Sequence, residues 1–493
     1  MITNTAANPS QLKADENFGY VWLISIVAAL GGLLFGWDWV VIGGAKALFE
    51  PFFGIAKDTV VNGQSVIVTN ANLSGWANSC ALLGCLAGSL LTGVLSDKFG
   101  RKRLLIFAAF LFAASSVLTG WAANFHQFIL WRIAGGVAIG MASNLSPLYI
   151  AEISPARMRG RLVSLNQLTI VIGILAAQLL NMVITQKVPD GATAAMIAHS
   201  WNGQHGWRWM FTLVAAPSLL FFVAAFFVPE SPRWLVKNGL PDQARKILAR
   251  LSGENYAAAE TENIRQTIAT EEISRVRLAD LKEPRLLKIL LIGCGLAVLQ
   301  QWSGINVLFN YGSNIFNTAG FGVNTTLLFI VITGVVNAAF TFVALGTVDR
   351  WGRRGLMLFG CAGIAVAHIL TGLAYALHLQ GIAVLLFVLA AIGCYAMSLA
   401  PVTWVVISEI FPNRIRGTAI SVAVSVLWVA CFILTLTFPL LENAIGTGNT
   451  FWLYAAICVV GFIFIKFKLP ETKGKSLEEI ERELLEKSQP IHS

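Results

Sequence analysis

Twelve apolar runs, each long enough to cross a lipid bilayer, constrain this chain more than any other feature of its sequence. Only 12% of its 493 residues are charged, against roughly 25% in a typical soluble domain. The sequence therefore predicts an all-α membrane protein with twelve transmembrane helices. A spanning helix needs about 20 apolar residues, which places the helices near residues 20–46, 71–95, 104–122, 127–150, 162–185, 208–228, 287–318, 325–347, 356–376, 380–408, 417–440 and 449–467.

The basic residues predict how the chain is oriented. An even number of spans puts both termini on one side, and that side carries most of the 35 Lys and Arg residues. Because cytoplasmic loops are enriched in Lys and Arg, we expect both termini in the cytoplasm and the protein in a cell (inner) membrane. The net charge of +9 is spread over short loops instead of one face, which argues against a nucleic-acid partner.

Three motifs occur twice, in the same order and at similar spacing. The segments 93–103, 152–160 and 229–233 are echoed by 349–354, 409–417 and 470–472. A duplicated membrane chain indicates a transporter with its site between the halves. We expect a cytoplasmic N-terminus at 1–19, six-helix halves at 20–228 and 287–468, a helical cytoplasmic linker at 229–286 that is either a latch or a solvated connector, and a cytoplasmic tail at 469–493.

Two charged residues lie well inside the predicted spans. Asp38 lies in the glycine-rich run from Gly31 to Gly44, and Arg132 lies in the fourth span. A lone charge at the bilayer centre costs at least about 2.5 kcal/mol, so mutual pairing is the economical arrangement. Such a pair can load and release one proton when its solvation or distance changes. The alternatives are a permanently closed structural pair and an interfacial Asp38 that reaches water.

Side-chain amides form a second candidate site in the seventh span. Gln300, Asn306, Asn310 and Asn314 follow one another at separations of 6, 4 and 4, beside Gln301. Amides donate and accept hydrogen bonds, which suits a neutral polyhydroxyl ligand, although a single amide can equally join two helices. Candidates to complete the pocket are Gln167, Asn337 and the aromatic residues Phe35, Trp404 and Trp428.

Charged residues at the cytoplasmic ends of the spans predict a gate. Paired acids and arginines can hold the inner gate shut in one state and release it in the other, or the arginines serve only to set topology. The candidates are Asp97, Arg101, Arg103, Glu152, Arg159, Glu230, Asp349, Arg353, Glu409 and Arg416.

The sequence gives no sign of catalysis. It has no phosphate-binding Gly-x-x-x-x-Gly-Lys-Ser/Thr loop, and its six His and seven Cys residues show no metal-ligand spacing. We therefore expect no enzyme activity, no metal and no cofactor, with a proton gradient as the driving force.

The motifs as a set resemble the sugar porter family of the major facilitator superfamily. The resemblance covers about residues 20–478 and is carried by Gly31 to Asp38, Gly93 to Arg103, Arg132 to Gly136, Pro147 to Glu152, Asn166 to Leu168, Pro229 to Trp234, Gln300 to Asn306, Pro401 to Trp404 and Pro470 to Lys475. It implies a twelve-helix carrier of monosaccharides. It also implies that the sugar is held by Gln167, Gln300, Gln301, Asn306, Asn337 and Trp404.

Asp38 stands at a position that is acidic in the proton-coupled branch of this family and commonly an amide in passive facilitators. A second acid found in helix six of some xylose-type relatives is missing here, where the chain reads Leu213-Val214-Ala215. Our hypothesis is proton-coupled symport of a hexose or pentose such as glucose or xylose by a monomer. The alternatives are a passive facilitator and, more remotely, a transporter-like sugar sensor.

Overall fold

A computed structural model of the chain describes residues 17–61, 64–155, 157–189, 191–273, 283–379, 381–412, 415–473, 475 and 479. The N-terminal segment before residue 17 and the tail beyond residue 479 lie outside the described residues, so the expectations for them are not addressed.

Within the described ranges, twelve helices are long and apolar enough to cross a membrane, which confirms the predicted fold class. Six helices in the first half of the chain and six in the second make up this set, and three of the twelve are interrupted. In order they are α1 (Phe18–Phe52), α2 (Ala71–Phe99), α3 (Arg101–Gly120), α4 (Phe125–Ile153), α5 (Arg159–Ile184), the run η2 (Asn202–Gly206), α7 (Trp207–Thr212) and α8 (Ala215–Ala225), the pair α12 (Pro284–Trp302) and α13 (Ile305–Asn310), α15 (Val323–Trp351), α16 (Arg353–Ala376), the pair α17 (Ile382–Ala396) and α18 (Leu399–Ile410), α19 (Arg416–Ile445) and α20 (Thr447–Lys468).

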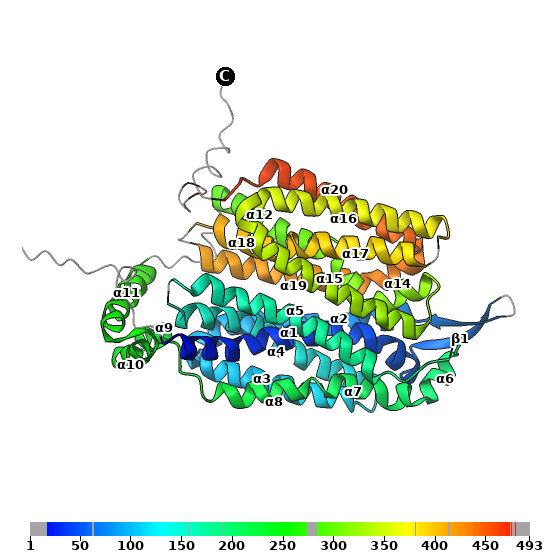
Figure 1. Ribbon diagram of the computed structural model, residues 1–493, viewed down its shortest axis with the longest axis horizontal. Coiled ribbons are helices and arrows are strands. Elements are labelled where there is room, and N and C mark those ends of the chain that lie inside the picture. Colours follow the sequence, from blue (N-terminus) through cyan, green and yellow to red (C-terminus); the bar gives the residue numbers. More distant parts are fainter. Residues whose placement is uncertain are drawn as a thin grey trace, which may run out of the picture.

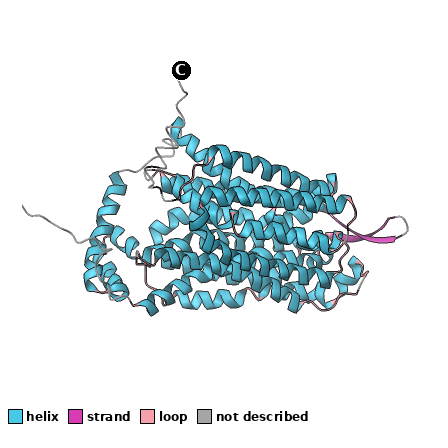
Figure 2. Ribbon diagram, turned by 45° about the horizontal axis from the view of Figure 1, so that its top comes forward, coloured by secondary structure: helices cyan, strands magenta, loops and turns pink. Residues whose placement is uncertain are grey.

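The two halves lie side by side as two layers of helices (Figure 1). Helices α1 to α8, including the short α6 (Ala194–His199), form one layer and α12 to α20 the other. The layers meet where α2 packs on α19, α5 on α15 and α1 on α13. The helices α9 (Pro232–Lys237), α10 (Pro241–Ser252) and α11 (Glu254–Ile273) gather at one end, which we name the linker end (Figure 2). The predicted division at residues 228 and 287 stays a prediction.

A β-hairpin marks the opposite end, which we name the hairpin end (Figure 2). Strands β1 (Ala56–Val61) and β2 (Gln64–Thr69) pair antiparallel, with Ala56 opposite Thr69. We did not predict this hairpin from the sequence. The sequence does contain a hairpin signal, because β-branched residues flank the dipeptide Asn62-Gly63, the pair that suits a two-residue turn.

Helix α1 is longer than predicted. The apolar run ends near residue 46, but the helix continues to Phe52 and includes Lys46 and Glu50, which are 1% and 4% exposed. The predicted span ended at Lys46, whose charge finds partners inside the protein, described below. The seventh span also differs: it breaks at Gly304, whose φ is 85°, and ends at Asn310, before the separate helix α14 (Gly312–Thr318).

The hydrophobic core at the hairpin end is shared by both halves. Val41 and Phe49 of α1 belong to the same buried cluster as Leu308 and Phe309 of α13. Ser313 of α14 donates a hydrogen bond to the carbonyl oxygen of Gly43 over 2.8 Å. The halves are therefore packed against each other at this end.

Candidate functional site

Asp38 and Arg132 form a buried ion pair between α1 and α4. Nη1 of Arg132 lies 2.9 Å from Oδ1 and 2.8 Å from Oδ2 of Asp38, and the two side chains are 4% and 6% exposed. The Arg132 guanidinium also lies over the Phe211 ring, 5.4 Å from its centroid. The pairing predicted from sequence is present, and it holds both charges inside the first half of the chain.

A small cavity adjoins this ion pair and reaches the second half. Its walls include Trp39, Asn78 and Arg132 from the first half and Asn310 from α13. Three buried polar atoms here have no hydrogen-bond partner among the described residues. They are the donor Nε of Arg132 and the acceptors Oδ1 of Asn78 and Oδ1 of Asn310. The lining of this space is mostly apolar, and Asn78, Arg132 and Asn310 supply polar groups able to bind water or a ligand hydroxyl.

The amides of the seventh span form a connected network. Nε2 of Gln301 donates to Oε1 of Gln300 over 3.2 Å, and Nδ2 of Asn306 donates to Oε1 of Gln301 and, over 3.3 Å, to Sγ of Cys431. Gln300 also donates to the carbonyl oxygens of Leu399 and Ala400, both at 3.2 Å, so this residue joins α12 to α18 as well. The structure thus places Gln300, Gln301 and Asn306 together, at 2%, 6% and 7% exposure.

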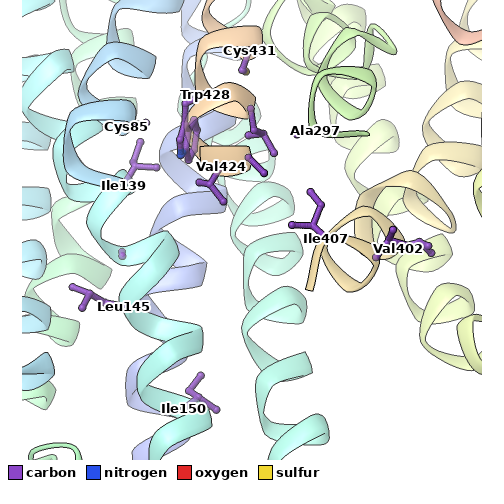
Figure 3. Close-up of a cluster of buried hydrophobic side chains, with 14 of the residues drawn as sticks. Cys85, Ile139, Leu145, Ile150, Ala297, Val402, Ile407, Val424, Trp428 and Cys431 are labelled. Atoms are coloured by element: carbon purple, nitrogen blue, oxygen red, sulfur yellow. The ribbon is translucent and has the colours of Figure 1, made fainter. Parts of the chain in front are cut away.

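Three aromatic rings meet where the halves face each other. The ring centroids of Phe35 and Trp39 on α1 lie 6.1 Å and 6.0 Å from the ring centroid of Trp428 on α19, and 5.7 Å from each other. Figure 3 shows Trp428 and Cys431 on this one helix, so the aromatic cluster adjoins the amide network through Cys431. Sequence reasoning found Phe35 and Trp428 but missed Trp39, which lies next to Asp38 and four residues from Phe35 on the same helix face.

The other predicted sugar residues lie on three further helices. Gln167 is half-buried on α5, Asn337 is buried on α15, and Trp404 is 41% exposed on α18. Trp404 follows Leu399 and Ala400, the residues that Gln300 contacts, by about one turn. No contact of these side chains with the amide network is described, and their role as ligands stays a prediction.

The charged motif at the linker end of the first half forms a tight network. Arg101 binds Glu152 through Nε and Nη2, both at 3.0 Å, and Nη1 lies 3.5 Å from Asp97. Glu230 accepts hydrogen bonds from the backbone amides of Arg101 and Lys102 at the start of α3. A carboxylate at a helix N-terminus is favoured by its free amides and by the helix dipole.

The second half repeats this arrangement. Arg353 lies 3.3 Å from Glu409, and Glu471 accepts hydrogen bonds from the backbone amides of Arg353 and Arg354. Glu471, which we did not select, is thus the counterpart of Glu230, and the repeated Pro-Glu pair could have identified it. Arg103 and Arg159 are exposed, and the side chains of Asp349 and Arg416 lie outside the described ones. Each described pair lies within one half, and the role of these residues as an inner gate stays a prediction.

Substitution of Gly100, which lies beside Glu230 in this network, should lower the stability of the protein. The φ of Gly100 is 88°, and an added Cβ would lie 2.2 Å from Oε2 of Glu230. We expect Gly100→Ala to cost about 1–3 kcal/mol and to lower the apparent unfolding temperature in detergent, because alanine is strained at this φ. Gly93→Ala is the matched control: it lies in α2 with no atom within 4 Å of the added Cβ. Equal unfolding temperatures for both variants would contradict the prediction.

A second group of buried charges was missed by sequence reasoning. Nζ of Lys46 lies 2.6 Å from Oδ1 of Asn314 and 3.7 Å from Oε1 of Glu50. Asn314 in turn donates to Glu442 over 3.5 Å. The signal available in the sequence was the four-residue spacing of Asp38, Ile42, Lys46 and Glu50, which places them on one face of α1.

Comparison with known proteins fits this geometry. A family model described as "Sugar (and other) transporter" matches residues 24–484. The chain belongs to this family. It is 37% identical to the arabinose-proton symporter of Bacillus subtilis (strain 168), covering 96% of this chain and 98% of that protein. It is 36% identical to the D-xylose-proton symporter of Escherichia coli (strain K12), with coverage of 95% and 97%.

Solved structures give the same result for the fold. The partially occluded inward open conformation of the xylose transporter XylE from E. coli matches with a TM-score of 0.80 at 34% identity, covering 93% of this chain and all of that one. The same transporter bound to 6-bromo-6-deoxy-D-glucose matches with a TM-score of 0.76 at 36% identity, covering 95% of this chain and all of that one. The chain is therefore a multi-pass membrane transporter and not an enzyme.

Proposed function

We propose that this sugar transporter family member is a proton-coupled symporter of a neutral monosaccharide, a hexose or a pentose, that works by alternating access. The observation that carries the proposal is the buried ion pair of Asp38 with Arg132, in which Asp38 lies on the same helix as the aromatic residues Phe35 and Trp39. Relatives named as arabinose-proton and D-xylose-proton symporters support it.

Helix α1 connects the proton and the sugar. A proton on Asp38 removes its negative charge and frees Arg132, which changes the forces that hold α1 against α4. Phe35 and Trp39 lie within one turn of Asp38 and contact Trp428 in the other half. Movement of α1 on proton binding therefore reaches the aromatic wall of the pocket directly. We propose Gln300, Gln301 and Asn306 as the hydrogen-bonding wall, with Gln167, Asn337 and Trp404 completing it.

The proposed orientation places the linker end in the cytoplasm of a cell (inner) membrane, and the functional unit is one chain. Basic residues concentrate at this end, including Arg101, Lys102 and Arg103 at the start of α3. The proton then enters from the hairpin end and leaves at the linker end.

Uptake into liposomes tests this function. Purified protein in sealed liposomes should accumulate a labelled monosaccharide above its external concentration when the external solution is the more acidic, and an uncoupler should abolish the excess. An unchanged plateau with uncoupler would identify a passive facilitator, and sugar binding without flux would identify a sensor. Competition by pentoses, hexoses and polyols in the same assay would identify the sugar.

A further inference from the structure

Three charged residues meet between the halves at the hairpin end, apart from the Asp38 pair. Lys46 and Glu50 are on α1, and Glu442 is on α19 near its end. Lys46 is 1% exposed and Glu50 4%, whereas Glu442 is half-buried. We name Lys46, Glu50, Asn314 and Glu442 the hairpin-end cluster.

Lys46 faces one carboxylate directly and is linked to a second one, in the other half, through Asn314. Within its own helix it faces Glu50 over 3.7 Å. Across the halves it donates to Asn314 over 2.6 Å, and Asn314 donates to Glu442, which also accepts a hydrogen bond from Thr447 over 3.1 Å. The ammonium group further lies 4.4 Å from the centroid of the Tyr311 ring. Lys46 therefore interacts with Glu50, which stays beside it on α1. Through Asn314 it is also linked to Glu442, which moves away when the halves part.

The cluster holds one more acid than base. With both glutamates ionised it carries an excess negative charge, and burying an unpaired charge is costly. Oε1 of Glu50 lies 3.7 Å from Nζ of Lys46 but is buried and accepts no hydrogen bond from the described residues, so a proton on this carboxylate breaks no hydrogen bond of that oxygen. A proton there makes the cluster neutral and leaves the full charge of Lys46 to attract Glu442.

We propose that Glu50 is a second proton-binding site, separate from Asp38, and that its proton releases Lys46 to hold Glu442 and so closes the hairpin end. The inference rests on the proposed alternating access of the two halves. When the halves part, Lys46 and Glu50 stay together on α1 and become hydrated, and Glu50 then gives up its proton to the outer solution.

Other titratable groups surround this site. Tyr311 lies against Lys46, and Glu442 is the acid of the second half. Arg208 is held by the carbonyl oxygens of Gly120 and Ala122, and Asp58 by the backbone amides of Ala194 and Ala195. Lys57, His126, His199 and His205 lie on elements that contact α1. Cys80 and Tyr454 lie near Tyr311, and Tyr375 and Tyr454 lie near Glu442. Substitution of Glu50 itself is therefore needed to assign a pH response to it.

The proposal can be tested by measuring the distance between the two halves at the hairpin end as the pH is changed. Spin labels on Ala123→Cys and Asn443→Cys, two exposed residues of opposite halves, report open and closed populations in lipid nanodiscs. The labelled native sequence controls for the seven native cysteines. We expect the open-to-closed ratio to fall at least about fivefold between pH 8 and pH 5.5 in the otherwise wild-type protein.

The variants are expected to act in opposite directions. Glu50→Gln mimics the protonated acid and should stay closed at both pH values, whereas Glu442→Gln and Lys46→Met remove the link between the halves and should favour the open state at both. Asp38→Asn should keep the pH response.

A wild-type protein with no pH response, or a Glu50→Gln variant that opens as Glu442→Gln does, would overturn the proposal, because a packing role alone moves both variants the same way. Loss of the pH response in Asp38→Asn would assign it to Asp38 and would also overturn the proposal. Failure of proton-driven uptake in liposomes, with the Glu50 response intact, would instead reject the proposed symport.

Discussion

Asp38→Asn should abolish accumulation of sugar and leave exchange of sugar across the membrane intact. With a 100-fold proton gradient, one-to-one coupling supports up to about 100-fold accumulation, equivalent to about 2.7 kcal/mol, whereas the variant should reach only equal concentrations inside and outside. The physical reason is that asparagine keeps the size and a hydrogen-bonding oxygen beside Arg132 but cannot take up a proton. The measurement is the uptake plateau and the counterflow rate in the same liposomes.

The double variant Asp38→Asn/Arg132→Gln separates coupling from folding. Removing one partner of a buried ion pair leaves the other charge uncompensated and costs about 3–5 kcal/mol of stability. We therefore expect a lower unfolding temperature for Asp38→Asn and a partial recovery in the double variant, in which accumulation stays lost. Accumulation by Asp38→Asn equal to that of the wild type would reject the coupling role of this residue.

Asn306→Leu should weaken sugar binding by roughly 10- to 100-fold, because a buried ligand hydroxyl left without its partner costs about 1–3 kcal/mol. Asn306 is 7% exposed and is connected to Gln301 and Cys431, so the loss also disturbs the amide that precedes it in the network. The measurement is the half-saturation concentration for exchange, together with the equilibrium binding of labelled sugar in detergent.

Gln178→Leu provides the matched control for this prediction. Gln178 is a buried amide, 1% exposed, and its Nε2 lies 3.5 Å from Oγ1 of Thr333, so it joins α5 to α15 instead of belonging to the amide network. We expect its half-saturation concentration to stay within about threefold of the wild type, even if stability falls. A similar loss of affinity in both variants would show that Asn306 acts through packing and would remove it from the proposed pocket.

Two features of this structure could be predicted from the sequence alone: the number of spanning helices and the pairing of Asp38 with Arg132. The apolar runs predicted the number of spanning helices, because each helix satisfies its own backbone and needs only length and apolar side chains to be recognised. The pairing of Asp38 with Arg132 also followed from sequence, since each was a lone charge in an apolar span and had one economical partner.

Helix interruptions and long-range polar contacts were harder to predict. The break at Gly304 and the separate helix α14 lie inside one predicted span, so hydropathy did not distinguish them. Gln300 was selected as a sugar ligand, but its amide also bonds two backbone carbonyls of α18, a contact between residues about 100 positions apart. No periodic pattern contains that information.

The sequence by itself determined the membrane class, the helix count, the repeat and the pairing of Asp38 with Arg132, because these depend on hydropathy and on the cost of a lone charge in lipid. Only the tertiary structure decided that Lys46 is buried and that it faces Glu50 on one side and Asn314 on the other. The physical reason is that a charged residue at the end of an apolar run is compatible with both a loop and a helix. Its environment is set by partners such as Asn314, 268 residues away in the chain, which only packing of the two halves brings within reach.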